Sequence, residues 1–360
     1  MKESPDKSGE DRPAVDRDSP SLCVWFTAPR KIELRPCPLD KPRAGEVRVR
    51  ALYSGISHGT ELLVYRGEVP PGIALDIKLS TLEGSADFPL KYGYASVGRV
   101  VEAGAGVETP SEGDMVFAFN PHQTEYVIPA CHTIKLPEGA SARRAIFLAN
   151  IETAINAMLD AAPRIGERVV IFGQGVVGLL IAQLARRCGA GAVITVDPIE
   201  RRRALSLALG ADSALDPSDG DVAAAIRKLT SGAGADIAIE ASGRPDTLDQ
   251  ALKSVAFEGR VVVVSWYGVK RSPVALGNEF HRNRLTVKSS QVSNLDPRLS
   301  PRWTVERRRG LALDYLGELR LDELITHTFA FEEAEAAYRL IDEQQEESVQ
   351  VILDYGGIEG

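Results

Sequence analysis

From residue 141 onward, Val- and Ile-rich runs alternate with segments of helical spacing. In AIFLANIETAINAMLDAA (residues 145–162), apolar residues recur three and four positions apart, as on one face of a helix. The runs between such segments show almost no polar alternation, and they read RVVIF, AVITV, DIAIE and RVVVV. Strands buried on both faces have this composition, and they occur in parallel sheets whose connections are helices. This part of the chain therefore predicts an α/β fold with a doubly wound parallel sheet.

The part of the chain before this alternation has a different character. From about residue 22 to 137, short alternating strands such as EVRVRALYSG and ASVGRVVEAG are broken by Gly and Pro, which is typical of a β-rich, barrel-like domain. Residues 1–20 are charged and Pro/Ser-rich, without an apolar core, so we expect a disordered tail and no signal peptide. We place the barrel-like domain at 21–145 and the parallel sheet at 146–290.

Charge and cysteine usage exclude several classes of partner. The net charge of −8 and the scattered basic residues argue against nucleic acid, and the Arg runs at 201–203 and 307–309 are expected to be solvated helix faces. No apolar stretch approaches the roughly 18 residues that span a bilayer. The four cysteines are far apart and form no CxxC, so a disulfide framework is not expected and a cytoplasmic location fits.

GQGVVG at residues 173–178 follows one of the apolar strands and opens an apolar helix. In the dinucleotide-binding motif G-x-G-x-x-G, Gly173 would make the tight turn, Gly175 would let the backbone approach a pyrophosphate, and Gly178 would let helix and strand pack closely. Val176 and Val177 begin the helix, whose N-terminus offers free N–H groups to a phosphate. The sequence therefore predicts a dinucleotide site here.

The next strand ends in Asp197, about 20 residues further on, where a carboxylate can bind the ribose hydroxyls of the adenosine. A carboxylate there repels a 2′-phosphate, which favours NAD over NADP. Arg201 and Arg202 leave NADP possible, because a nearby Arg can accept that phosphate.

These features resemble the medium-chain dehydrogenase/reductase superfamily. GEVRVRALYSGIS is similar to the entry to its catalytic domain, GYASVGRVVEAGAGV to a strand that normally begins with Gly-His-Glu, GDMVFAF to its Gly-Asp-x-Val strand, and IETAINAML to its crossing helix. The resemblance implies a GroES-like barrel, a Rossmann sheet, and a return to the first domain at 291–360. Within the superfamily the chain looks closest to a zinc-free group that includes the 2-desacetyl-2-hydroxyethyl bacteriochlorophyllide dehydrogenases.

The metal-ligand positions of the zinc alcohol dehydrogenases fall here on Ser57, Tyr94 and about Ala149, which are poor or impossible zinc ligands. The lobe that should carry four closely spaced cysteines holds only Cys131. We therefore expect neither a catalytic nor a structural zinc ion. His58, Glu61, His122 and His132 could be considered as another metal site, but each is expected to be polar surface or pocket lining.

Without zinc, a side chain must act on the substrate oxygen during hydride transfer. The resemblance points to Thr60 as the relay hydroxyl, with Tyr94 as a general acid and Ser57 as a further hydroxyl; turn chemistry or strand packing would also explain these residues. By the same resemblance, His58 would touch the pyrophosphate and Thr153 the nicotinamide. The resemblance also implies that Ser242 would lie in the loop beneath the adenosine, and that Ser265 and Trp266 would lie beside the carboxamide of the nicotinamide.

Three functions remain open at this point. One is an NAD(P)-dependent dehydrogenase or ketoreductase acting on a secondary alcohol or ketone. Another is a reductase of C=C bonds conjugated to a carbonyl, with proton delivery from Tyr94, and the third is a non-catalytic nucleotide-binding protein. The Pro-rich stretch 67–93 is expected to form the pocket rim, the substrate to be a small molecule, and the strand at 285–290 to pair two subunits in a homodimer.

Overall fold

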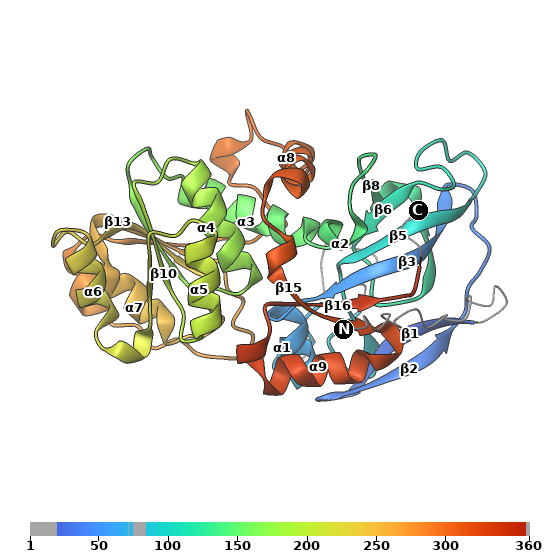
Figure 1. Cartoon of the computed structure of the whole chain (residues 1–360), viewed down its shortest axis with the longest axis horizontal. Helices are drawn as coiled ribbons and strands as arrows, with labels where there is room; N and C mark the ends of the chain where they lie inside the picture. Colours follow the sequence, from blue (N-terminus) through green and yellow to red (C-terminus); the bar gives the residue numbers. More distant parts are fainter. Residues whose placement is uncertain (1–19, 71, 75–83, 358–360) are drawn as a thin grey trace, which may run out of the picture.

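The computed structural model describes residues 20–70, 72–74 and 84–357. The tail at 1–19 and residues 71 and 75–83 of the expected pocket rim lie outside the described residues. Figure 1 shows two bodies side by side, with the yellow-green part of the chain in one and the blue and red ends in the other. Among the described helices, none is both long and apolar enough to cross a bilayer.

One body contains a six-stranded sheet in which every pairing is parallel. Its order is β11-β10-β9-β12-β13-β14, and the strands are β9 (Arg168–Phe172), β10 (Ala192–Val196), β11 (Ser213–Leu215), β12 (Ala235–Glu240), β13 (Val255–Val263) and β14 (Thr286–Ser289). In order along the chain this is 3-2-1-4-5-6, the doubly wound dinucleotide-binding arrangement. The chain reverses direction across the sheet between β9 and β12, and a crevice for a ligand forms at such a point.

Helices cover both faces of this sheet, as the Val/Ile-rich strands predict. They are α3 (Leu148–Ala161), α4 (Val176–Arg187), α5 (Glu200–Ala208), α6 (Val222–Leu229) and α7 (Thr247–Ser254) (Figure 1). Alternate residues of β9 enter two different cores. Val169 and Ile171 pack in the core that contains α3 and α4, whereas Val170 and Phe172 pack in the core with α6 and α7. The predicted α/β fold is confirmed.

The other body is built from antiparallel strands, except for one parallel pair. The larger sheet has the order β15-β16-β3-β5-β6-β8, with β7 on β3: β3 (Glu46–Ile56), β5 (Ser96–Ala103), β6 (Met115–Ala118), β7 (Glu125–Pro129), β8 (Thr133–Lys135), β15 (Ile325–Ala330) and β16 (Gln350–Asp354). A smaller sheet has the order β2-β1-β4: β1 (Ser21–Ala28), β2 (Lys31–Cys37) and β4 (Leu90–Lys91).

The chain thus begins in the antiparallel body, goes on to form the parallel sheet, and then returns to the antiparallel body. Helices α1 (Thr60–Arg66) and α9 (Ala334–Glu343) lie on the antiparallel body (Figure 1). Helix α2 (Ala142–Ala145) lies where the chain passes between the two bodies, and α8 (Val305–Glu318) packs on α3. The boundaries at residues 145 and 290 stay a proposal.

Two cysteines that the sequence leaves unpaired are joined in the structure. Cys23 of β1 and Cys37 of β2 form a disulfide, with their Cα atoms 6.2 Å apart and both side chains buried. They are brought together by the antiparallel register, in which Cys23 lies opposite Arg35, two residues from Cys37. The expectation of a chain without a disulfide is corrected at this pair, while Cys131 and Cys188 are free and exposed.

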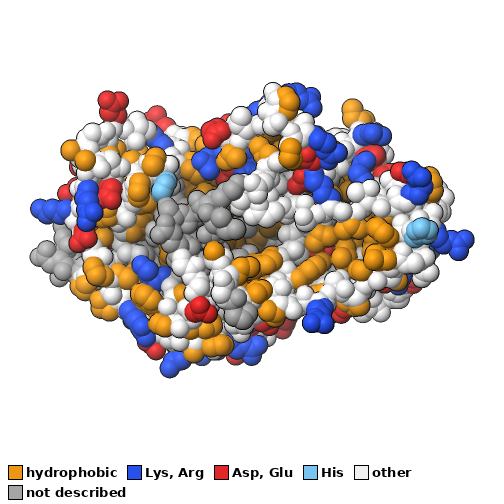
Figure 2. Space-filling view, turned by 180° about the vertical axis from the view of Figure 1, so that it is seen from behind, with side chains coloured by type: hydrophobic (Ala, Val, Ile, Leu, Met, Phe, Trp, Pro, Cys, Tyr) orange, Lys and Arg blue, Asp and Glu red, His pale blue; other side chains and the backbone are white. Residues whose placement is uncertain are grey.

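Strand β14 forms one edge of the parallel sheet and exposes most of its residues. Val287 on this strand is 40% exposed, and Phe257 and Leu276 of the same body are more exposed still. Figure 2, which views the molecule from behind, shows hydrophobic side chains gathered along the half that carries this sheet. The edge therefore offers both unpaired backbone groups and apolar side chains.

Candidate active site and dinucleotide-binding crevice

The Gly-rich turn lies at the crevice between β9 and β12. Gly173 follows β9 with φ +88°, and a Cβ atom there would lie 2.5 Å from the Cα atom of Ser242, in the loop after β12. A Cβ atom on Gly178 would lie 1.9 Å from the carbonyl oxygen of Gly173. A Cβ atom on Gly175, the N-cap of α4, would meet no atom within 4 Å. Two glycines are thus required by the fold, and the third faces open space where a phosphate can reach the N–H groups of Val176 and Val177.

Asp197 lies directly after β10 and is 3% exposed. Its Oδ2 atom accepts a hydrogen bond from the N–H of Gln174 at 2.7 Å, and its Oδ1 atom accepts one from Ile199 at 2.9 Å. The carboxylate therefore contacts the Gly-rich turn, and each oxygen keeps a lone pair for a ribose hydroxyl.

The arginines after Asp197 are already engaged. Arg202 donates through Nη2 to the carbonyl oxygens of Gln345 and Ser348, both at 2.9 Å, and Arg203 forms an ion pair with Asp216 at 2.7 Å. A 2′-phosphate would have to draw Arg202 away from these carbonyls. The role of Arg202 in binding the cofactor stays a prediction. We expected Arg202 on a solvated helix face, but its side chain is half-buried.

Basic side chains from three segments lie near one another beside Asp197. His58 Nε2, Arg202 Nε and His327 Nδ1 are buried nitrogens without a hydrogen-bond partner among the described residues. Burial lowers the pKa of His58 to about 3, and the nearby charges of Arg202 and His327 contribute. Unpaired buried donors are costly unless a ligand satisfies them. Three such nitrogens could serve an anionic ligand, and the contact of His58 with the pyrophosphate stays a prediction.

The ends of β12 and β13 are linked around a buried carboxylate. Glu240 accepts hydrogen bonds from the backbone and hydroxyl of Ser242 through Oε1, and from the hydroxyl of Tyr267 through Oε2 at 2.6 Å. The Ser265 hydroxyl accepts from the N–H of Gly243 at 2.9 Å. Ser242 and Ser265 therefore shape the two loops, while the neighbouring Trp266 is 40% exposed.

The three predicted catalytic hydroxyls come together in the antiparallel body. Ser57 follows β3, Thr60 begins α1, and Tyr94 precedes β5. Burial first, and the charge of Glu61 second, raise the pKa of Tyr94 above its usual value, while hydrogen bonds from the Ser57 and Thr60 hydroxyls oppose this shift. Tyr94 therefore stays a phenol, which can donate to a developing alkoxide.

The two bodies meet close to these hydroxyls. Gly268, after β13, has φ +59°, and a Cβ atom there would lie 2.3 Å from the carbonyl oxygen of Glu68, just beyond α1. The N–H of Val269 donates to the same oxygen at 3.2 Å, and Lys270 pairs with the Glu68 carboxylate at 3.3 Å. The loop beside Ser265 and Trp266 is thereby joined to the helix that carries Thr60.

Two side chains expected at the surface or lining a pocket are in fact buried. Glu61 and His122 are both 0% exposed, and Tyr338 of α9, which the sequence did not single out, is buried beside them. Their partners are far apart along the chain, so no local spacing indicated the cluster.

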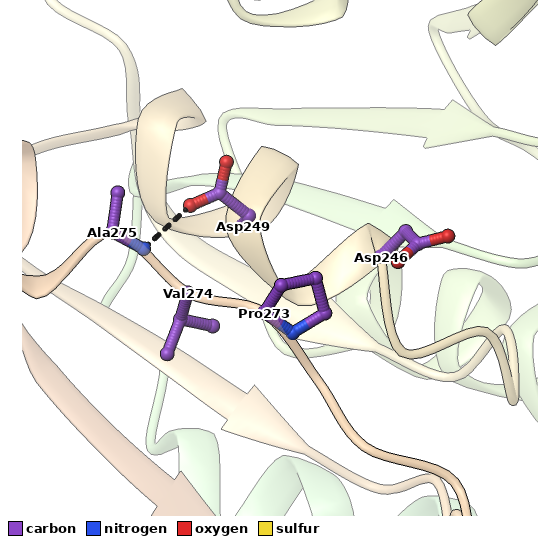
Figure 3. A pocket seen from close by; sticks show the side chains of 5 residues that line it. All are labelled: Asp246, Asp249, Pro273, Val274 and Ala275. Atoms are coloured by element: carbon purple, nitrogen blue, oxygen red, sulfur yellow. Dashed lines mark hydrogen bonds between the residues drawn. The ribbon is translucent and has the colours of Figure 1, made fainter.

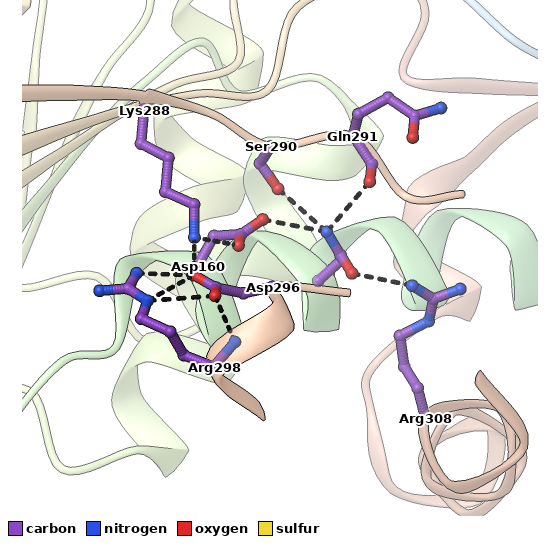
Figure 4. Close-up of polar contacts among 8 residues, drawn as sticks. Asp160, Lys288, Ser290, Gln291, Asp296, Arg298 and Arg308 are labelled. Atoms are coloured by element: carbon purple, nitrogen blue, oxygen red, sulfur yellow. Dashed lines mark hydrogen bonds and ion pairs between the residues drawn. The ribbon is translucent and has the colours of Figure 1, made fainter. Parts of the chain in front are cut away.

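Helix α3 is braced against the segment after β14 by polar contacts (Figure 4). Thr153, expected near the nicotinamide, donates to the carbonyl of Ala149 at 2.9 Å. One turn further on, Asn156 donates to Ser290 at 3.3 Å and accepts from Arg308 of α8 at 2.8 Å. Arg308 is 3% exposed, so the predicted solvated face is wrong at this residue. Its charge is paired with the buried Glu152 carboxylate at 3.4 Å.

A hollow of about 480 Å³ lies between α7 and residues 273–275 (Figure 3). Asp246, Asp249 and Pro273 are among its lining residues, and Asp249 accepts from the N–H of Ala275 at 3.0 Å. None of the predicted site residues lines this hollow, so we assign it no part in the reaction.

Comparison with known proteins agrees with this geometry. Residues 176–304 match the family model described as zinc-binding dehydrogenase. D-guloside 3-dehydrogenase of Escherichia coli K12 is 31% identical over 324 residues, which cover 86% of this chain and 92% of that protein. A dehydrogenase from Sinorhizobium meliloti 1021 bound to NADP superimposes with a TM-score of 0.77 at 21% identity, covering 94% of this chain and 100% of that one. The same values hold for an E. coli CFT073 structure described as a short chain alcohol dehydrogenase complexed with NADH.

A doubly wound sheet with a Gly-rich turn, joined to an antiparallel body that holds polar hydroxyls, defines a nicotinamide-dependent oxidoreductase. The chain belongs to the zinc-type alcohol dehydrogenase-like proteins of the medium-chain dehydrogenase/reductase superfamily. The expected enzyme class is therefore confirmed, while the zinc-free subgroup stays a proposal.

Proposed function

We propose that this enzyme transfers a hydride between NAD and a secondary alcohol or ketone without a catalytic zinc ion. The observation that carries the proposal is the meeting of Ser57, Thr60 and Tyr94 next to the loops expected to hold the cofactor. The name of D-guloside 3-dehydrogenase, which describes oxidation of a sugar hydroxyl, supports an alcohol substrate.

When bound, the nicotinamide supplies or accepts the hydride. The hydroxyls of Ser57 and Thr60 lie close enough to act on the Tyr94 oxygen, and in the proposed mechanism they orient its O–H toward the substrate. In ketone reduction the carbonyl carbon gains the hydride and the oxygen gains the Tyr94 proton, and a proton from solvent restores the phenol before the next turnover. In alcohol oxidation Tyr94 first loses its proton to solvent, and its oxygen then takes the alcohol proton as the hydride leaves.

A substrate panel tests this function. The enzyme is mixed with NAD or NADH and with secondary alcohols, cyclic polyols, ketones and conjugated enones, and turnover is followed by nicotinamide absorbance. We expect turnover with an alcohol or ketone. Turnover restricted to enones would instead identify a C=C reductase, and nucleotide binding without any turnover would identify a binding protein.

We predict that the purified active enzyme contains no stoichiometric zinc. Ala149 offers no ligand atom, and the hydroxyls of Ser57 and Tyr94 are poor substitutes for thiolate and imidazole. Within the described ranges no cluster of three or more His, Cys, Asp or Glu side chains could hold a metal. Elemental analysis and activity after chelation check this. One zinc per chain, lost together with activity, would contradict it.

We predict that Asp197 selects NAD over NADP. Asp197→Asn keeps an oxygen near the N–H of Gln174 but removes the charge, so NAD affinity should fall and the difference from NADP should narrow. Calorimetric titration of both nucleotides measures this, with the exposed Asp219→Asn as a matched control. A wild-type enzyme that prefers NADP by about tenfold, or 1.4 kcal/mol, would show that Asp197 is misinterpreted.

We predict a homodimer that pairs at β14. The strand is an exposed edge, and its apolar Val287 is 40% exposed. Light scattering should give twice the chain mass at micromolar concentration, and Val287→Lys should shift the population toward monomer, because a charge on an edge strand opposes pairing. A monomeric wild type would contradict the prediction.

The location and the partners also remain proposals. A small-molecule substrate, with neither nucleic acid nor membrane as partner, fits the net charge of −8. We keep the cytoplasm as the proposed compartment. The Cys23–Cys37 disulfide weighs against it, because disulfides are uncommon in reducing compartments.

A further inference from the structure

A buried carboxylate lies directly behind the three hydroxyls. The Oε2 atom of Glu61 is 2.9 Å from Nε2 of His122 and accepts from the Tyr338 hydroxyl at 2.6 Å. Its Oε1 atom accepts from the backbone N–H of Ser57 at 2.9 Å. Glu61, His122 and Tyr338 are each 0% exposed. The carboxylate is thus held from three directions, and one of its partners is the turn that carries Ser57.

His122 also belongs to a second run of hydrogen bonds. Its Nδ1 atom is 2.6 Å from the Ser54 hydroxyl, which is 2.8 Å from the Tyr355 hydroxyl. One arrangement satisfies every group: Tyr355 donates to Ser54, Ser54 donates to Nδ1, and Nε2–H donates to Glu61. In this arrangement the Nε2–H of His122 is aimed at the Glu61 carboxylate.

The same cluster also touches the segment between β4 and β5 that carries Tyr94. Gly93 has φ +127°, and a Cβ atom there would lie 2.7 Å from the ring of His122. The ring therefore packs on the backbone immediately before Tyr94, while the charge of Glu61 acts on the phenol itself. The hydroxyl of Tyr338 also interacts electrostatically with that of Tyr94. The cluster contacts both segments that supply the catalytic hydroxyls.

A need for stability alone does not explain a charged group at this place. Replacing buried ionic groups with apolar side chains of similar volume is often neutral or stabilising, because desolvation opposes the attraction. Aromatic rings already pack around the site: the ring centroids of Phe26 and Tyr65 each lie 5.3 Å from the ring centroid of Tyr338. An apolar filling would therefore suit the fold, and a charge with three aimed donors points to a role in the reaction.

We propose that His122 and Tyr338 are positioning residues. They orient the Glu61 carboxylate, which holds the Ser57–Thr60 turn against Tyr94 and keeps the phenol proton available for the substrate oxygen. The proposal rests on the alcohol or ketone chemistry proposed above, but the hydrogen-bond arrangement that it requires can be measured without a substrate.

Turnover is measured with the best substrate of the panel for Tyr338→Phe, Glu61→Gln, His122→Leu and His122→Gln. Tyr338→Phe keeps the ring packing and removes one donor to Glu61; Glu61→Gln removes the charge. We expect kcat to fall by about 100-fold in Glu61→Gln, as for a misplaced catalytic group, with the Kd of NAD unchanged. The kcat of Tyr338→Phe should also be lower than that of the wild type. His122→Gln keeps an N–H donor, so its kcat should be higher than that of His122→Leu. The exposed Glu138→Gln and His132→Gln are matched controls.

Unchanged kcat in both Glu61→Gln and Tyr338→Phe would overturn the proposal. An equal loss in His122→Gln and His122→Leu would also overturn it for His122, because donor chemistry would then be irrelevant. Should His122→Leu fail to fold, Tyr338→Phe and Glu61→Gln decide alone.

Nitrogen NMR of the wild-type enzyme, which contains five histidines, tests the arrangement separately. The signal lost in His122→Gln should show a ring that carries its proton on Nε2 and has an unprotonated Nδ1, as the arrangement requires. A charged ring or the opposite tautomer would overturn the proposal. If the wild type turns over no alcohol or ketone, the proposed function fails, while this measurement still decides how Glu61 is held.

Discussion

Replacing Tyr94 with Phe should lower turnover by roughly 10²–10⁴-fold, the usual contribution of general acid–base catalysis. The change deletes one hydroxyl and keeps the ring, which packs edge-on against Tyr92 with centroids 6.3 Å apart. Thr60→Val, which is nearly isosteric, tests the second candidate in the same way. Steady-state kinetics with the best substrate of the panel measure kcat and KM, and the Kd of NAD is measured by titration.

Nucleotide affinity should hardly change in either variant, because the phosphates are expected on the turn of Gly173–Gly178 in the other body. Loss of kcat in one variant with NAD binding retained assigns the donor. Full activity in both variants would place the donor elsewhere, with His58 or a bound water next in line, and would refute our description of the catalytic chemistry.

The pH dependence follows from the same environment. Burial and the charge of Glu61 raise the pKa of Tyr94 above the roughly 10 of a free tyrosine. The protonated form therefore persists through neutral and mildly alkaline pH. Ketone reduction should show no loss of rate from ionisation of Tyr94 below about pH 10.

What the sequence predicts well is local. The strand before Gly173, the spacing to Gly178 and the carboxylate of Asp197 lie within one βαβ unit, so each can be interpreted from its neighbours. The alternating cores on either side of β9 follow from the Val/Ile-rich run itself. The resemblance then supplied Ser57, Thr60 and Tyr94, which the structure brings together.

What the sequence does not predict depends on contacts between distant segments. Glu61 and Tyr338 are separated by 277 positions, and nothing near either residue indicates the other. Arg308 looks like one of a run of exposed arginines, yet it faces Asn156 and Glu152 because α8 packs on α3. In each case a polar side chain is buried by tertiary packing, which overrides its usual preference for solvent.

The second large effect is expected from two alanine substitutions in the Gly-rich turn, which should separate binding from folding. At Gly175 the backbone has φ −72° and ψ −174°, which any residue can adopt, and a Cβ atom would meet no atom within 4 Å. Gly175→Ala should therefore leave the free energy of unfolding within about 1 kcal/mol of the wild-type value. The added methyl group would occupy the space expected for the pyrophosphate, so NAD affinity should fall by at least about tenfold, or 1.4 kcal/mol.

Gly178→Ala should act on the fold instead. Its Cβ atom would lie 1.9 Å from the carbonyl oxygen of Gly173, so β9 and α4 must move apart, at a cost of about 1–3 kcal/mol or more, as in an overpacked core. Denaturant unfolding without nucleotide and calorimetric titration of NAD measure the two effects. Gly310→Ala on α8, where a Cβ atom also meets nothing within 4 Å, is the matched control for both. Wild-type NAD affinity in Gly175→Ala would mean that the phosphates do not approach this turn, and the cofactor would have to be placed elsewhere in the crevice.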